Sequence, residues 1–177
     1  MRIIGLVGRK GSGKSLVAKR LAETHDFTVV PFAKPLKDML RAIGLDDVHL
    51  TGSLKEKPCP LLLGQTPRWA MQSLGTEWGR DLIHPDLWVH LWREAALRAR
   101  SPVVADDVRF VNEAAIIRRL GGILVRIVRD TPDDPSPDSH ASETGTDSIV
   151  CDSYLENDGT VEQLATGVDR LFITILA

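Results

Sequence analysis

Eight consecutive residues near the start of the chain match the pattern GxxxxGK[ST], which is typical of loops that bind nucleoside triphosphates. They are Gly8, Arg9, Lys10, Gly11, Ser12, Gly13, Lys14 and Ser15. Glycines at these places allow backbone angles at which successive N–H groups point at phosphate oxygens, and the positive end of the next helix adds to their field. Lys14 is spaced to reach the β- and γ-phosphates, and the Ser15 hydroxyl to coordinate magnesium. The loop therefore predicts a site for ATP with Mg2+.

A pair of carboxylates follows a later apolar run. Asp106 and Asp107 come directly after residues 102–105, which are typical of a buried strand. A carboxylate at such a strand end holds the magnesium shell or orients a nucleophile. We expect Asp106 to serve the metal, and Asp107 to hold the acceptor's sugar or a water on the metal. Which aspartate does which stays open, and either one alone has the alternative of capping the next turn.

Short apolar runs alternate with segments of helical period along the whole chain. The runs predict strands at residues 2–7, 27–30, 102–105, 122–128 and 148–151. The helical periods predict helices at residues 13–24, 35–43, 67–82, 85–99, 110–120 and 160–176. Because the strands are continuously apolar, they indicate a parallel sheet covered on both faces. We predict an α/β, three-layer fold of the P-loop NTPase class, with a five-stranded, mostly parallel sheet.

Two segments interrupt this alternation. Residues 35–100 form a long, mostly helical insertion, with a loop predicted at 46–66, in the position that carries the acceptor-binding region in small-molecule kinases. Residues 130–147 are acidic and contain three prolines, which predicts a surface loop in the place of a lid. We expect a single domain with a core of residues 1–34 and 101–177.

Composition bounds the function classes. Of 177 residues, 22 are Lys or Arg and 24 are Asp or Glu, and this near balance argues against a protein that coats nucleic acid or an anionic membrane. Two cysteines far apart give no disulfide framework and no zinc site. The first apolar run is too short for a signal peptide and no run is long enough to cross a bilayer, so we expect a cytoplasmic protein with small-molecule substrates. A homodimer is left open.

Several further stretches resemble the signatures of one family, the bacteriophage deoxynucleoside monophosphate kinases. They are FAKPLK at 32–37, TPRWAMQSLGTEWGR at 66–80, DLWV at 86–89, DVRFVNE at 107–113, HASE at 140–143 and NDGT at 157–160. These stretches occur in the family's order and span nearly the whole chain. They are therefore far more specific than the phosphate loop alone.

The resemblance implies transfer of the γ-phosphate of ATP to the 5′-phosphate of a deoxynucleotide. The implied acceptor site consists of Phe32, Lys37, Arg68, Trp69, Gln72, Glu77, Arg80, Trp88, Arg109 and Glu143. Guanidinium groups bind phosphate bidentately, so Arg68, Arg80 and Arg109 suit the acceptor dianion. The Gln72 amide lies on the same helix face as Arg68 and is able to read a base edge. Trp69 offers an aromatic ring on which a base would stack.

Four of these acceptor residues have plainer alternatives. Trp88 is a second candidate for stacking on a base, but its helical spacing also suits core packing. Arg80 has the alternative of an ion pair with an acid such as Glu77. Lys37 has the alternative of a solvated lysine, and Glu143 that of a residue in a polar loop.

On the donor side, phosphoryl transfer depends on positioning and charge rather than on a protein nucleophile. The catalytic set that we expect is Lys14, Arg109 and Asp107. Arg129 is expected to reach ATP, and Asn157 and Gly159 lie where adenine usually sits in these kinases. The same turn is also typical of a plain helix cap. Closure of the domain around both substrates is expected, because it excludes water.

Two rival functions stay open. One is a P-loop kinase of another small acceptor such as dephospho-coenzyme A, and the other is a P-loop ATPase or nucleotide-sensing module. The LGTE-x-GR stretch favours a nucleotide acceptor, and the arginines of the insertion count against the ATPase. A non-catalytic binder is disfavoured by the intact Lys14, Ser15 and acidic pair.

Overall fold

The computed structural model describes residues 2–129 and 145–176 of the chain. Glu143, and the predicted lid-like loop up to residue 144, lie outside the described residues. Within the described ranges no helix is long and apolar enough to cross a membrane.

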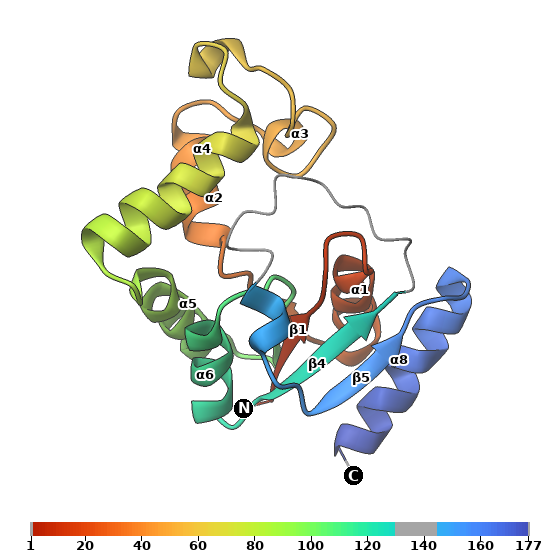
Figure 1. Ribbon diagram of the computed structural model, residues 1–177. Coiled ribbons are helices and arrows are strands. Elements are labelled where there is room, and N and C mark those ends of the chain that lie inside the picture. The colour runs from red at the N-terminus through yellow and green to blue at the C-terminus, as the bar shows by residue number, and fades with distance from the viewer. Residues whose placement is uncertain (1, 130–144, 177) are drawn as a thin grey trace. The chain divides into compact units, whose positions relative to one another are not determined.

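The chain divides into two compact units (Figure 1). One consists of Met1–Pro31 with Arg93–Ala177, and the other is Phe32–Trp92. The insertion expected at residues 35–100 overlaps the second unit over most of its length. Each unit has its own buried apolar cluster, as a separately packed body requires.

The first unit is built on five parallel strands in the order β2-β3-β1-β4-β5. They are β1 (Ile3–Val7), β2 (Thr28–Val29), β3 (Val103–Ala105), β4 (Ile123–Val128) and β5 (Ser153–Glu156). The central strand β1 pairs with β3 from Ile3 and Val103, and with β4 from Ile4 and Ile123. Parallel strands end at one edge, so the loops after β1 and β3 begin beside each other. The predicted fold class is confirmed.

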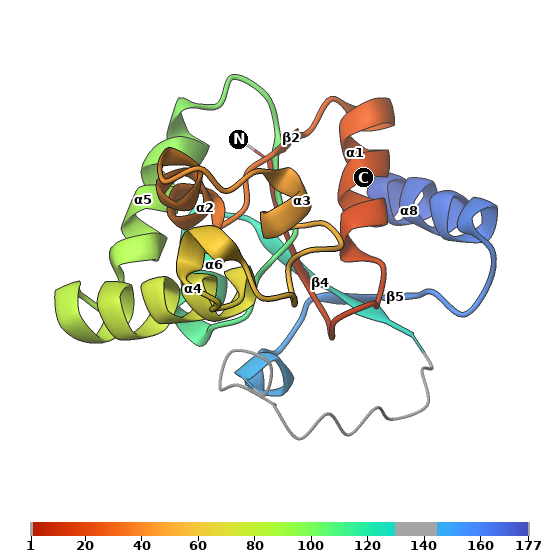
Figure 2. The ribbon, with the colours of Figure 1, turned by 90° about the horizontal axis from the view of Figure 1, so that it is seen from above.

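Helices cover both faces of this sheet. They are α1 (Lys14–His25), α6 (Val111–Arg119) and α8 (Val161–Leu176). Figure 2 shows α1 and α8 side by side on one face, where Ile4 and Leu6 of β1 join their apolar residues in one cluster. Gly5 points the other way, and a Cβ there would lie 2.6 Å from Ile117 Cδ1 of α6. Glycine therefore lets α6 approach the central strand.

The second unit is helical. Its elements are α2 (Lys34–Ala42), α3 (Asp47–Leu50), the 3-10 turn η1 (Pro60–Leu62), α4 (Pro67–Ser73) and the π-helix η2 (Leu74–Ile83). Helix α5 (Leu87–Arg98) begins here and ends in the first unit. The buried cluster joins Leu40 of α2, Leu50 of α3 and Ala70 of α4. It holds the three helices together around Cys59.

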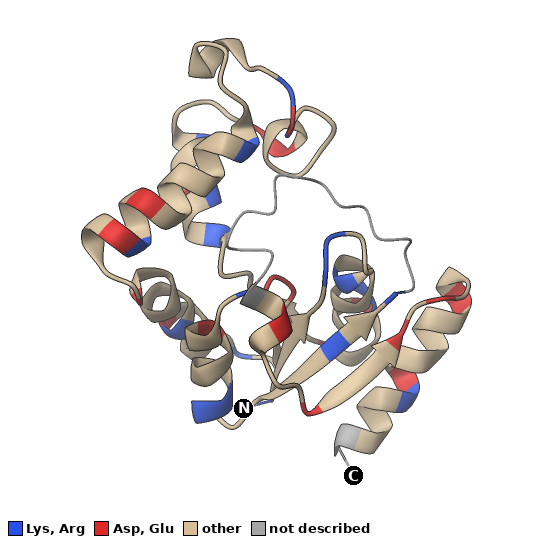
Figure 3. Ribbon diagram, viewed as in Figure 1, with Lys and Arg blue, Asp and Glu red and all other residues tan. Residues whose placement is uncertain are grey.

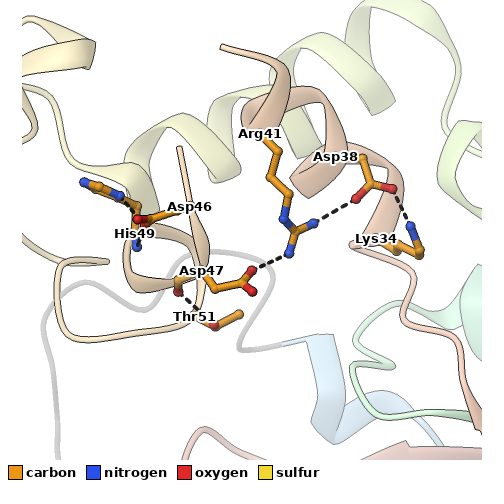
Figure 4. A network of polar contacts seen from close by, with 7 residues as sticks. All are labelled: Lys34, Asp38, Arg41, Asp46, Asp47, His49 and Thr51. Atoms are coloured by element: carbon orange, nitrogen blue, oxygen red, sulfur yellow. Dashed lines mark hydrogen bonds and ion pairs between the residues drawn. The ribbon is translucent and has the colours of Figure 1, made fainter. Parts of the chain in front are cut away.

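A chain of ion pairs joins α2 to α3 on the surface of the second unit (Figure 4). The Arg41 guanidinium donates to Asp38 on its own helix at 2.8 Å and to Asp47 of α3 at 2.6 Å. Lys34 Nζ also donates to Asp38, and this bond lowers the pKa of that carboxyl. The side chains are largely exposed to solvent, so each pair adds little stability.

Three predicted elements differ from the structure. The predicted strand 148–151 was wrong, because β5 starts at Ser153. The Arg126 guanidinium instead donates hydrogen bonds to the backbone carbonyls of Thr146, inside the 3-10 turn η3 (Gly145–Ser148), and of Ile149, directly after it. The loop predicted at 46–66 contains α3 and η1, and the helix predicted at 67–82 changes from α to π after Ser73.

The contact between α1 and α8 yields a prediction about pH. The Asp169 carboxylate of α8 forms hydrogen bonds with Arg20 and His25 of α1. These bonds, the one with Arg20 most strongly, lower the pKa of Asp169 to about 2. A depressed pKa means that this carboxylate adds stability above the pKa of about 4 that it has in the unfolded chain. That contribution is lost as the pH falls toward 2.

We therefore expect Asp169→Asn to lower the free energy of unfolding at pH 7 by about 1 kcal/mol, since the partly exposed carboxylate is screened by water. The free energies of unfolding of the variant and the parent, measured by denaturant titration, should converge as the pH falls from 4 to 2. The control is Glu23→Gln, which removes the exposed pair of Glu23 with Lys19 and should change little. A difference between Asp169→Asn and the parent that is independent of pH would contradict the role of the charge.

Candidate active site

The loop between β1 and α1 has backbone angles that only glycine adopts easily. Gly13, which caps α1, has a φ of 102°, and Gly8 has a φ of 154°. A Cβ on Gly8 would lie 2.6 Å from the Ile127 carbonyl oxygen, and one on Gly13 would collide with the Asn157 amide. The loop is therefore fixed between α1, β4 and the end of β5. Its N–H groups are held in one conformation, as a phosphate site requires.

Side chains of this loop fit a bound triphosphate. Lys14 Nζ donates to the carbonyl oxygens of Gly8 and Arg9 at 2.7 and 2.8 Å, so the ammonium lies over the loop. Ser12 is 4% exposed, and within the described residues its hydroxyl has no hydrogen-bond partner. A buried hydroxyl without a partner is costly, and a phosphate oxygen would satisfy it. Figure 3 shows basic residues along the same loop.

The predicted metal residues lie together. Ser15 Oγ donates to Asp106 Oδ2 at 3.3 Å, which joins the start of α1 to the end of β3. Among residues 2–129 and 145–176 no cluster of three or more His, Cys, Asp or Glu is placed to hold a metal. Magnesium bound with a nucleotide needs only one or two protein oxygens beside phosphates and waters. The Ser15 and Asp106 pair fits that requirement.

Arg109 follows the same strand end and is half-buried. Its backbone N–H, like that of Phe110, donates to the Glu113 carboxylate, at 2.8 and 3.1 Å. The buried Glu113 thus holds the chain at the start of α6. Over the described part of the chain, no side-chain hydrogen bond or ion pair engages the Arg109 guanidinium.

Asn157, expected beside adenine, supports the phosphate loop. It is 7% exposed, and its Nδ2 donates to the Ser12 carbonyl oxygen at 2.8 Å. Its own N–H donates to the Val128 carbonyl oxygen at 2.8 Å, which fixes the residue at the end of β5. Gly159 lies exposed just before α8, and Arg129 Nη1 reaches the Gly11 carbonyl oxygen at 3.4 Å.

An ionic link that sequence reasoning missed joins the phosphate loop to η3. The Asp147 carboxylate lies 3.6 Å from Arg9 Nη2 and 3.8 Å from Arg126 Nη1. The Arg126 side chain is only 18% exposed, and it also holds the Thr146 and Ile149 carbonyls. One signal was present in the sequence, because a charge inside the apolar run 123–128 needs a partner. The link places a carboxylate beside the loop.

Polar acceptor candidates lie in the second unit. Arg68 Nε donates to Glu56 Oε1 at 2.6 Å, and Arg80 Nη1 donates to the Pro85 carbonyl oxygen at 3.3 Å. Glu77 and Trp69 are exposed on the same helical segment, Trp69 by 53%. Gln72 is half-buried. The segment thus presents two cations, an acid and an aromatic ring.

Lys37 of α2 is half-buried. Unlike Lys34 on the same helix, it does not belong to the ion-pair chain of α2 and α3 (Figure 4). Neither Asp38 nor Asp47, the carboxylates of those ion pairs, therefore engages its ammonium.

Two aromatic acceptor candidates are core residues instead. Trp88 is 2% exposed and its Nε1 donates to the Gly75 carbonyl oxygen at 2.7 Å. Phe32 is 3% exposed and stacks on Trp92 with ring centroids 4.5 Å apart. A ring that stacks on a base needs an open face, so the interpretation of Trp88 as a base contact is corrected, and Phe32 packs in the core rather than facing an acceptor. Core packing, the alternative at Trp88, is what the structure has.

The comparison with known proteins decides the family. A model of the family described as deoxynucleotide monophosphate kinase matches residues 65–168, which is more than half of the chain. The chain belongs to the deoxynucleotide monophosphate kinase family. This match confirms the family resemblance that the motifs indicated. It also confirms the prediction that the protein is a kinase.

Relatives of this kinase occur in viruses. A protein of Acanthamoeba polyphaga mimivirus, named provisionally as a deoxynucleotide monophosphate kinase, is 37% identical over 92% of both chains. The deoxynucleoside-5′-monophosphate kinase of Escherichia phage T5 is 31% identical over 45% of this chain and 34% of its own length. The deoxynucleotide monophosphate kinase of Escherichia phage RB69 is 29% identical over 59% of this chain and 43% of its own.

The fold of this kinase is shared more widely. The shikimate kinase of Aquifex aeolicus superposes with a TM-score of 0.55 over 99% of this chain and 96% of its own, at 13% identity. The shikimate kinase of Acinetobacter baumannii, solved in complex with shikimate, superposes with a TM-score of 0.53 over 97% of this chain and 93% of its own, at 14% identity. At such low identity the likeness shows a common fold and nothing about substrate.

We predict that Asn157→Ala weakens the binding of ATP by this kinase. Without the Asn157 amide the Ser12 carbonyl loses its donor, which costs about 1 kcal/mol and corresponds to a roughly fivefold higher KM for ATP. The KM for the acceptor should not change. Thr166→Ala removes a hydroxyl bond on the exposed side of α8 and serves as control. An unchanged KM for ATP in Asn157→Ala would contradict the supporting role of this residue.

Proposed function

We propose that the protein transfers the γ-phosphate of ATP to the 5′-phosphate of deoxynucleoside monophosphates, giving the diphosphate and ADP. The observation that carries this proposal is the phosphate loop with Lys14 and the Ser15–Asp106 pair in a chain of this family. The names of the viral relatives supply the acceptor class. These names favour a deoxynucleoside monophosphate as the acceptor over dephospho-coenzyme A and over water.

The reaction needs little covalent chemistry from the protein. An oxygen of the acceptor monophosphate attacks the γ-phosphorus, the bond to the β-phosphate oxygen breaks, and ADP leaves with that electron pair. The attacking phosphate oxygen is already ionised at neutral pH, so no general base is required. What the protein must supply is alignment and positive charge. Lys14 and Arg109 of the first unit are the cations that we assign to the transferring phosphoryl group.

Magnesium, when bound, would neutralise charge on the donor phosphates. The residues that would hold it are Ser15 and Asp106, which already contact each other. Asp107, the neighbouring half-buried acid, is assigned to the acceptor's sugar or to a water of the metal shell. This division gives the two aspartates separate and testable roles.

The acceptor groups that we assign to the second unit lie on α2, α4 and η2. Arg68, Arg80 and Lys37 are cations suited to a monophosphate dianion. Gln72 has the donor and acceptor needed to read a base edge, and the exposed Trp69 ring can stack on the base.

A coupled assay of ADP release tests the function. The panel contains ATP and Mg2+ with dAMP, dCMP, dGMP, dTMP, the corresponding ribonucleotides, and dephospho-coenzyme A. We expect release only when a deoxynucleoside monophosphate is present. Release without any acceptor would establish an ATPase, and release with dephospho-coenzyme A alone would establish the other kinase.

We predict that Lys14→Ala and Arg109→Ala each lower kcat by about hundredfold or more, because each removes a cation from the transferring group. Arg119→Ala, at the exposed end of α6, is the matched control and should keep the parental kcat. Steady-state kinetics at saturating ATP and acceptor measure both. A near-normal kcat in either test variant would remove that residue from the catalytic set.

We further predict that the two aspartates differ in their magnesium dependence. Asp106→Asn should raise the Mg2+ concentration for half-maximal rate by about tenfold, because a carboxylate ligand is lost. Asp107→Asn should lower kcat while leaving that concentration nearly unchanged. A magnesium titration of each variant at fixed ATP decides the matter, and the reverse pattern would exchange the two roles.

A further inference from the structure

The segment that carries the acceptor candidates Glu77 and Arg80 is a ten-residue π-helix, Leu74–Ile83. Its backbone bonds skip one residue more than those of an α-helix, and its last turn closes from the His84 N–H to the Gly79 carbonyl oxygen at 3.0 Å. Such helices are rare, mostly single turns inside α-helices, and frequent at functional sites. A run this long needs a tertiary contact that favours the π register over the α register.

Trp88 at the start of α5 supplies that contact. Its Nε1 donates to the Gly75 carbonyl oxygen at 2.7 Å, and the side chain is 2% exposed. The bond therefore engages a carbonyl inside η2 from a different helix of the same unit. If the indole N–H were lost, no water would easily replace it at so buried a place.

Gly79 lies against the same indole. A Cβ on Gly79 would stand 2.6 Å from both Nε1 and Cε2 of Trp88, closer than real Cβ atoms approach other atoms. Gly79 thus gives the indole room to pack on η2 while its N–H reaches the Gly75 carbonyl, and the tilted Trp78 ring has its centroid 6.3 Å from that of Trp88. This contact explains why Gly79 of the LGTEWGR stretch carries no side chain, without any contact to substrate.

We propose that Trp88 is a positioning residue, which holds η2 in its π register and so aims the side chains of Glu77 and Arg80 at the acceptor. The inference rests on the proposed function. A return to the α register would rotate every side chain after Gly75 about the helix axis, because each N–H would then bond to a carbonyl one residue nearer along the chain. Arg80, which reaches the Pro85 carbonyl oxygen at 3.3 Å, would then leave its present direction.

The decisive variant is Trp88→Phe, which keeps an aromatic ring and removes the N–H. We expect the KM for the best deoxynucleotide of the panel to rise at least fivefold, with the KM for ATP unchanged. Gly79→Ala, which forces the same contact apart from the other side, should have the same effect. The matched control is Trp92→Phe, one turn further along α5, where the indole is 1% exposed and stacks on Phe32. It should lower Tm without raising the acceptor KM.

The outcomes separate the two levels of the proposal. If the parent enzyme shows no acceptor-dependent ADP release, the proposed function fails. If the parent is active and Trp88→Phe only loses Tm, as Trp92→Phe does, Trp88 is merely structural and the inference is overturned.

Should Trp88→Phe not fold, hydrogen exchange on the parent enzyme decides. Added deoxynucleotide should slow exchange of the η2 amides, while unchanged exchange there would contradict the inference.

Discussion

Phosphate oxygens must be met by backbone N–H groups that cannot turn away, and the first unit is organised around that requirement. The loop after β1 takes up φ angles open to glycine, and the Ile127 carbonyl and the Asn157 amide leave no room for a side chain at Gly8 and Gly13. Ile127 belongs to β4 and Asn157 directly follows β5, so the parallel order of β1, β4 and β5 is what fixes the loop. Electrostatic catalysis depends on this rigidity, because donors that need not reorganise stabilise a transition state best.

The second unit meets a different requirement, since a base and a monophosphate are recognised by side chains. Their directions are set by helix register. The contact of Trp88 with Gly75 and Gly79 determines that register in η2, much as Asn157 fixes the phosphate loop. In both units a buried side-chain amide or indole N–H donates to a backbone carbonyl of the functional segment. Neither donor needs to contact a substrate.

Much of the first unit was predictable because local chemistry and topology agree there. Glycines, Lys14 and Ser15 follow an apolar run, and Asp106 ends another, so a parallel sheet brings them to one edge. The rest depends on tertiary contacts that one sequence does not reveal. The α and π registers use the same residue types, and the contact of Trp88 with η2 separates them. The observed β5 starts later than the predicted strand, because the Arg126 guanidinium donates hydrogen bonds to the carbonyls of residues 146 and 149. Asn157 has the same sequence signal whether it faces adenine or supports the loop.

The most direct test of phosphoryl transfer to a nucleotide is to follow the phosphorus itself. ATP labelled at the γ-phosphate is incubated with Mg2+, the protein and each deoxynucleoside monophosphate, and the products are separated. We predict that the label appears in the β-phosphate of the deoxynucleoside diphosphate, in amounts equal to the ADP formed. Label found only in inorganic phosphate would contradict a kinase, and would mean that water is the acceptor at this phosphate loop.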